Sequence, residues 1–248
     1  MLRHTGQART FAHNVRIAAL LCLTAGFVNV SGFVAFMVLT TNVTGHVAVF
    51  ADRLSQGDIS GARVVGLWML LFLLGAFTSS LIVNVVGRNK QYSYVIPVVI
   101  EFLILFAVGS SGYLYDHTLV KTEIFAGSLL FAMGMQNAMV SIISGSVVRT
   151  THLTGMFTDL GIELSSVIQE KGEVKNDLKR KIKLRLVIIV FFFLGGIAGG
   201  YLFKLMHYQT FYVPAGILLL TLFYDIFRVR GHKLVRDAWA RLHGGSPS

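Results

Sequence analysis

The feature that most constrains this chain is a series of apolar runs, each about long enough to cross a lipid bilayer. A transmembrane helix needs about 20 predominantly apolar residues. The sequence contains six such runs, at 15–38, 64–86, 92–114, 122–148, 184–206 and 210–227. Each run is expected to be helical, because the hydrocarbon core cannot satisfy free backbone N–H and C=O groups. The sequence therefore predicts an all-α membrane protein with six transmembrane helices and the lipid bilayer as its surroundings.

The basic residues are distributed unevenly between these runs. A net charge of +10 could indicate binding to nucleic acid, but in a membrane protein it more often reflects the enrichment of Lys and Arg in cytoplasmic loops. If the N-terminus is cytoplasmic, 18 of the 22 Lys and Arg residues fall on the cytoplasmic side of six spans. This predicts a multi-pass protein with both termini in the cytoplasm and no nucleic-acid partner.

A short polar motif follows the first and fourth apolar runs. Its first copy is Thr40-Thr41-Asn42-Val43-Thr44-Gly45, and its second is Thr150-Thr151-His152-Leu153-Thr154-Gly155. Threonine competes for backbone hydrogen bonds and glycine loosens a helix, so each copy predicts a helix break followed by a restart. Thr44 and Thr154 are the expected N-caps, with free N–H groups and the positive end of the helix dipole nearby.

Other short matches indicate that the two halves of the chain are duplicates. Gly26 matches Gly134 at an offset of 108, Gly75 matches Gly195 at 120, and Pro97 matches Pro214 at 117. The predicted units are a cytoplasmic tail at 1–14, three-helix repeats at 15–115 and 122–228, a charged cytoplasmic loop at 170–183, and a basic cytoplasmic tail at 229–248. Three spans per half is an odd number, so the repeats should be inverted relative to the membrane, as in many secondary transporters.

A polar pocket between the first and fourth spans is the predicted binding site. It would be lined by both motifs, with Asn29, Gln136 and Asn137 alongside them. Hydroxyl, amide and backbone groups of this kind could hold a small polar or ionic solute. The alternative is structural: the motifs would be capped turns, and the three amides would form hydrogen bonds between helices.

Two acidic positions are candidates for proton or ion coupling. Glu101 lies roughly 15 Å inside the third span at the helical rise per residue, and an ionisable group at that depth is a site hypothesis by default. The alternative is a protonated or hydrogen-bonded glutamate that fixes the packing. Asp159 shares a helix face with Glu163 and could bind a cation, although such a pair is more often solvated. His46 and His152 occupy different motif positions and have no third ligand at metal spacing, so we predict no metal and no cofactor.

The chain resembles a family of bacterial membrane proteins. The resemblance rests on Gly26 to Asn29, Gly134 to Asn137, the two motifs, and the continuation of the second motif through Thr158-Asp159-Leu160-Gly161. These stretches are similar to the YoaK-type family, which is classed as a domain of unknown function. The resemblance implies a bacterial inner-membrane protein with six spans, and it implies no activity or substrate.

Three functions remain open from the sequence. The first is a secondary transporter or channel-like carrier of a small polar or ionic solute. The second is a non-transporting scaffold, sensor or assembly factor, and the third, less favoured, is an intramembrane lipid enzyme. Metalloprotease, serine-hydrolase and nucleotide-binding motifs are absent from the sequence, so we predict no enzyme and no catalytic residues. A homo-oligomer is compatible with each of the three.

Overall fold

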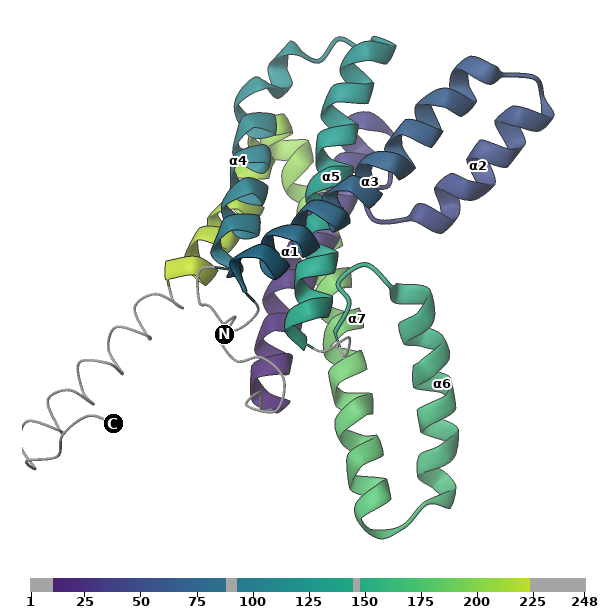
Figure 1. The fold of residues 1–248 in the computed structure, drawn as a ribbon, viewed down its shortest axis with the longest axis vertical. Helices are drawn as coiled ribbons and strands as arrows, with labels where there is room; N and C mark the ends of the chain where they lie inside the picture. The colour runs from purple at the N-terminus through teal and green to yellow at the C-terminus, as the bar shows by residue number, and fades with distance from the viewer. Residues whose placement is uncertain (1–10, 88–92, 145–147, 224–248) are drawn as a thin grey trace, which may run out of the picture.

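The computed structural model describes residues 11–87, 93–144 and 148–223, and these residues form helices joined by turns (Figure 1). In chain order the elements are α1 (Phe11–Phe36), α2 (Val43–Ser55), α3 (Ile59–Val86), α4 (Val95–Ser111), the 3₁₀ turn η3 (Gly112–Leu114), α5 (Leu119–Ser144), α6 (Leu153–Gln169), α7 (Gly172–Met206) and the 3₁₀ turn η4 (His207–Phe211), followed by helical residues 212–223. The described ranges contain no strand. The predicted all-α class is confirmed.

Five helical stretches are long and apolar enough to cross a membrane. They are Ala18–Phe36, Ile59–Val86, Val95–Leu114, Leu119–Ile142 and Gly172–Phe223. The first four coincide with the first four predicted spans. The fifth is 52 residues long and contains the fifth predicted span and residues 210–223 of the sixth. Within it, α7 ends before His207, whose φ of 49° and ψ of −133° take the backbone out of the helix.

The chain turns back on itself at η4. Tyr212 follows this turn, and its ring lies 5.3 Å from the ring of Phe106 on α4. The Tyr212 hydroxyl is also 2.9 Å from Oγ of Ser110, at the end of the same helix. These contacts fasten the start of the last helix to α4, and Figure 1 shows that helix running back from η4 in yellow-green.

Glycines allow two pairs of long helices to pack backbone to backbone. α1 packs along α7, and a Cβ added to Gly26 or Gly195 would overlap the carbonyl oxygen of Phe192 or Leu23. α3 packs along α5 in the same way. Small residues permit this close approach, which provides dispersion contacts where the hydrophobic effect between helices is weak.

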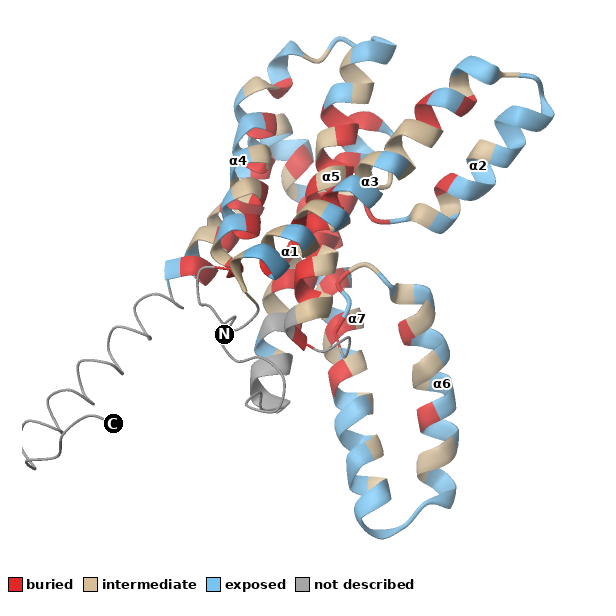
Figure 2. Cartoon of the chain, in the orientation of Figure 1, coloured by how far each residue is buried: buried red, intermediate tan, exposed pale blue. Residues whose placement is uncertain are grey.

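The interior of the bundle is built mainly by α1 and α5 (Figure 2). Leu129, Leu130, Met133 and Met139 on α5 are completely buried. By contrast, the outer faces of α3 and α7 expose large apolar side chains, including Phe77 with 61% exposure. An apolar surface around a buried core is what lipid contact requires, since lipid replaces water as the solvent there.

Two helical hairpins extend away from the bundle, one toward the upper right and one toward the bottom of the view in Figure 1. One contains α2 and the start of α3, and the other contains α6 and the start of α7. The charged segment 170–183, predicted to be a loop, lies largely within α7, which begins at Gly172. The loop prediction was wrong because hydropathy detects contact with lipid, whereas Lys, Glu and Arg are good helix formers in water.

Some predictions fall outside the described residues. These are most of the tail at 1–14, the tail at 229–248, residue 92 of the third predicted span, residues 145–147 of the fourth and residues 224–227 of the sixth.

Candidate functional site

Each motif separates a long helix from a shorter one, as predicted. α1 ends at Phe36, Met37 has a φ of 58°, and α2 begins at Val43. α5 ends at Ser144 and α6 begins at Leu153. The N-caps are Asn42 and His152, so the prediction that Thr44 and Thr154 are the caps was wrong. Both threonines lie inside the first turn, where the backbone is already helical.

The motif glycines are explained by the cap side chains. Asn42 Oδ1 accepts a hydrogen bond from the backbone N–H of Gly45 at 3.0 Å. A Cβ on Gly45 would meet the Asn42 amide, and a Cβ on Gly155 would overlap the His152 ring. Glycine therefore leaves room for the cap side chain to lie over the first turn, and His152 occupies in the second motif the place of Asn42 in the first.

The two motifs meet at one cavity of about 390 Å³, which we call the motif cavity. Its walls come from both motifs, from α3, from α5 and from Arg149. The lining residues are Thr41, Asn42, Val43, Thr44, Phe72, Asn137, Ser141, Arg149, Thr151, His152, Leu153 and Thr154. The structure thus brings together residues 110 positions apart in the sequence. The first turns of α2 and α6 both lie at this cavity.

The other residues predicted for the site do not line the motif cavity. Asn29 Oδ1 accepts a hydrogen bond from the N–H of Thr41 at 3.1 Å and so fixes the first break. Gln136 Nε2 donates to the carbonyl of Leu21 at 2.8 Å and joins α5 to α1. Thr40 and Thr150 are completely buried, and their hydroxyls have no hydrogen-bond partner among the described residues.

A second cavity, of about 600 Å³, lies between α2 and α3, and we call it the α2–α3 cavity. His46 lies in its wall, with Nε2 donating to the carbonyl of Leu39 at 2.8 Å. The His46 ring lies 5.7 Å from the ring of Trp68. Burial lowers the pKa of His46 below its ordinary value, against a smaller opposing effect of the Leu39 hydrogen bond. His46 therefore links α2 to Leu39 in the first helix break, and its lowered pKa favours the neutral ring.

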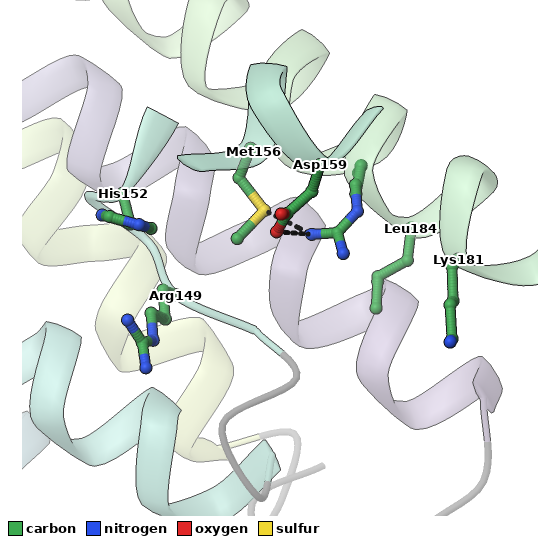
Figure 3. Close-up of a pocket in the computed structure, with 7 residues that line it drawn as sticks. Arg149, His152, Met156, Asp159, Lys181 and Leu184 are labelled. Carbon is green, nitrogen blue, oxygen red and sulfur yellow. Dashed lines mark hydrogen bonds and ion pairs between the residues drawn. The ribbon is translucent and has the colours of Figure 1, made fainter. Parts of the chain in front are cut away.

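A third cavity, of about 360 Å³, lies between α6 and α7, and we call it the α6–α7 cavity (Figure 3). Arg185 enters it from α7 and forms ion pairs with two acids of α6. Its Nη1 lies 2.9 Å from Asp159 Oδ2, and its Nε lies 2.7 Å from Glu163 Oε2. A further hydrogen bond of 2.9 Å from Nη2 makes the contact with Glu163 bidentate. The acid pair considered for a cation therefore holds an arginine of the same chain.

The three cavities share lining residues. Asn42 lines both the α2–α3 cavity and the motif cavity. Arg149 and His152 line both the motif cavity and the α6–α7 cavity. The equivalent cap positions of the two motifs, Asn42 and His152, therefore each stand between the motif cavity and one outer cavity.

Glu101 lies on α4 and lines none of these three cavities. It is 1% exposed, and neither carboxylate oxygen has a hydrogen-bond partner within the described part of the chain. A buried carboxyl without partners is costly, so it stays a candidate for coupling.

Sequence reasoning missed Arg149 and Arg185 as site residues. Both were interpreted as charges that set the membrane topology. Arg185 is separated from Glu163 by 22 positions, so no local spacing could pair them. Among the described residues no three His, Cys, Asp or Glu side chains form a group that could hold a metal ion.

Comparison with known proteins finds a family of unknown function and one transmembrane protein to which this chain is similar. The family model "Protein of unknown function (DUF1275)" matches residues 17–224. The UPF0700 transmembrane protein YoaK of Bacillus subtilis (strain 168) is 25% identical over 183 residues, which cover 73% of this chain and 80% of that protein. No solved structure matches the chain.

Proposed function

The chain belongs to the DUF1275 family of transmembrane proteins, and from that premise we propose that it is a secondary transporter or channel-like carrier of a small polar or ionic solute. It would act as a carrier and not as an enzyme. The observation that carries the proposal is the motif cavity, where two helix breaks from distant parts of the chain line one polar space. Irregular backbone at membrane depth is tolerated where protein or water satisfies it, and transporters use such breaks to bind their substrates.

An inverted pair of three-helix repeats is part of the proposal, and the glycine contacts support it. Gly26 lies against the carbonyl of Phe192, and Gly134 lies against the carbonyl of Phe72. An offset of 108 relates the two glycines, and an offset of 120 relates the two phenylalanines. Gly195 against Leu23 and Gly75 against Phe131 follow the same two offsets. A pseudo-two-fold axis would generate each contact from its counterpart.

Six spans follow if α7 and the helix beginning at residue 212 cross the membrane separately. The 52-residue stretch that contains them would be about 78 Å long as one straight helix, more than twice the hydrocarbon thickness of about 30 Å. The break at His207 and the contacts of Tyr212 with α4 favour two crossings. Together with the charge asymmetry, this gives cytoplasmic termini in a bacterial inner membrane.

The shared lining residues suggest a route for the solute. In this topology the α2–α3 cavity opens outward and the α6–α7 cavity opens to the cytoplasm. Asn42 and His152 then stand at the two ends of the motif cavity. Movement of one hairpin at a time would expose the motif cavity alternately to each side, and Glu101 is the proposed coupling group.

Cysteine accessibility in membrane vesicles tests the proposal. Thr44→Cys and Thr154→Cys would be made after Cys22, the only cysteine, is replaced by alanine. Both positions are exposed to the motif cavity, so both should react with a membrane-impermeant thiol reagent when it is supplied on both sides. Leu73→Cys is the control, because Leu73 is 62% exposed on the lipid-facing surface of α3 and should stay unreactive.

Two outcomes distinguish a carrier from a scaffold. Reaction at both motif positions, with no reaction at the lipid-facing control position 73, supports a water-filled site shared by the motifs. If both motif positions are as unreactive as Leu73→Cys, the cavity is dry and a scaffold with capped turns is the better description.

A further inference from the structure

We propose that the motif cavity binds a small oxyanion, held between the Arg149 guanidinium and the first turn of α6. This inference rests on the proposed function and names the chemical class of its solute. Inorganic phosphate is the simplest representative, because near neutral pH it carries both acceptor oxygens and a hydroxyl.

The charge of the cavity wall is the first argument. Arg149 lines the motif cavity, and none of the twelve lining residues is Asp or Glu. Within the described residues Arg149 forms no ion pair. Its side chain lines both the motif cavity and the α6–α7 cavity. A guanidinium presents a planar fork of N–H donors that fits the paired oxygens of an oxyanion better than it fits a halide.

The nearby acids do not cancel this charge. Asp159 and Glu163 are the closest acids of α6, and both are paired with Arg185. Lys181 adds a further cation to the wall of the α6–α7 cavity. An anion that leaves the motif cavity past Arg149 would therefore enter the α6–α7 cavity among basic side chains. The acid that lines the α6–α7 cavity, Asp159, is already paired with Arg185.

The dipoles of α2 and α6 also favour an anion in the motif cavity. The first turns of α2 and α6 lie at the motif cavity through Thr44 and Thr154, and neither first turn contains an acidic residue. The α6 N-terminus receives no side-chain hydrogen bond from its cap residue. The positive end of the α6 dipole at the cavity favours an anion there.

An unpartnered side-chain atom in the wall points independently to a ligand. Asn137 lines the cavity, and its Oδ1 is buried without a hydrogen-bond partner in the described structure. Buried polar atoms normally have partners, and the hydroxyl of a protonated oxyanion could supply one for Asn137 Oδ1.

The test is phosphate binding to the purified full-length protein in detergent, measured by the shift of its melting temperature. Sodium phosphate would be titrated at constant ionic strength, with sodium chloride replaced step by step, so that screening of exposed charges does not change. Arg149→Gln removes the proposed anchor. Arg180→Gln is the matched control, because Arg180 is an exposed residue near the start of α7 that pairs with Asp177 at 3.7 Å and lines neither the motif cavity nor the α6–α7 cavity.

We expect phosphate to raise the melting temperature of the natural protein and of Arg180→Gln. Arg149→Gln should weaken phosphate binding roughly tenfold to hundredfold, which is the loss expected for a hydrogen bond to a charged group. Arg149→Lys keeps the charge without the fork and should give an intermediate affinity. It also provides the comparison if Arg149→Gln does not fold.

Three results would overturn the oxyanion assignment. One is stabilisation by chloride equal to that by phosphate, another is equal phosphate affinity in all the arginine variants, and the third is no phosphate effect on the natural protein. If phosphate does not bind while Thr44→Cys and Thr154→Cys react with the thiol reagent, the carrier proposal stands and only the proposed solute class is wrong. If phosphate binds but liposomes containing the protein do not take it up, the binding site stands and transport fails.

Discussion

Alanine substitution at the helix-crossing glycines is the sharpest test of how the membrane bundle is held together. A Cβ on Gly26 would overlap the backbone carbonyl oxygen of Phe192. Unlike a side chain, that carbonyl cannot rotate away, so α1 and α7 must move apart. Overpacking of this kind costs typically about 1–3 kcal/mol, and the separation would also loosen the neighbouring contact of Gly195 with Leu23.

Gly216 provides the matched control within a membrane helix. A Cβ there meets nothing within 4 Å, so Gly216→Ala should only gain helix propensity, roughly 0.5–1 kcal/mol. The two substitutions should therefore differ by about 1.5–4 kcal/mol, in opposite directions from the natural protein. Gly134→Ala should destabilise as much as Gly26→Ala, because Gly134 meets the carbonyl of Phe72 in the same geometry.

Thermal unfolding of the purified variants in one mild detergent is a suitable assay. At roughly 2–4 °C per kcal/mol for a chain of this size, the contrast between Gly26→Ala and Gly216→Ala should be easily measured. The reasoning fails if Gly26→Ala is as stable as Gly216→Ala. A large loss at Gly26 with none at Gly134 would instead refute the equivalence of the two crossings.

Three further predictions concern ionisable groups. Glu163→Gln should destabilise the protein by about 1.5–3 kcal/mol, because it weakens the charged, bidentate contact with Arg185 while Asp159 still pairs with that arginine. Asp159→Asn should cost no more than about 1 kcal/mol, since that half-exposed acid is screened by water. Chemical unfolding of both variants checks this order. Burial lowers the pKa of His46, so the unfolded chain binds a proton more readily, and stability should be complete above the ordinary histidine pKa and fall below it. The melting temperature should therefore be lower at about pH 5 than at about pH 7.5, and His46→Gln should reduce the difference. Glu101→Gln should leave the protein folded and remove the pH dependence of solute uptake into liposomes that contain it. If the substitution only lowers the melting temperature, Glu101 is a packing residue.

The membrane helices could be predicted from the sequence because lipid imposes one strong condition on each span. The first four apolar runs differ from α1, α3, α4 and α5 by a few residues at their ends. The threonine-rich breaks were also predictable, because their chemistry is local. The start of α7 at Gly172 was not, because a charged stretch continuing a membrane helix into water has the composition of a loop.

The wall of the candidate site could be predicted only in part. The repeat of the motifs indicated that Thr44 and Thr154 belong together, and both line the motif cavity. The cap residues were misassigned because Asn, Thr and His can all begin a helix, and only the backbone decides which one does. Arg185 was missed because its pairing with Glu163 depends on how α6 folds back along α7, which no pattern in either segment specifies.

The joint between Arg185 and Glu163 gives α6 the geometry of a lever. Its first turn forms part of the motif cavity wall, and the ion pair holds the helix about ten residues further along, roughly 15 Å away at the helical rise. The helix then continues for six residues beyond this pivot, to Gln169 at the tip of the hairpin. A tilt of about 5° around the pivot would displace the first turn by roughly 1 Å. A displacement of the hairpin tip at Gln169 would thus move His152, at the other end of α6, in the opposite direction.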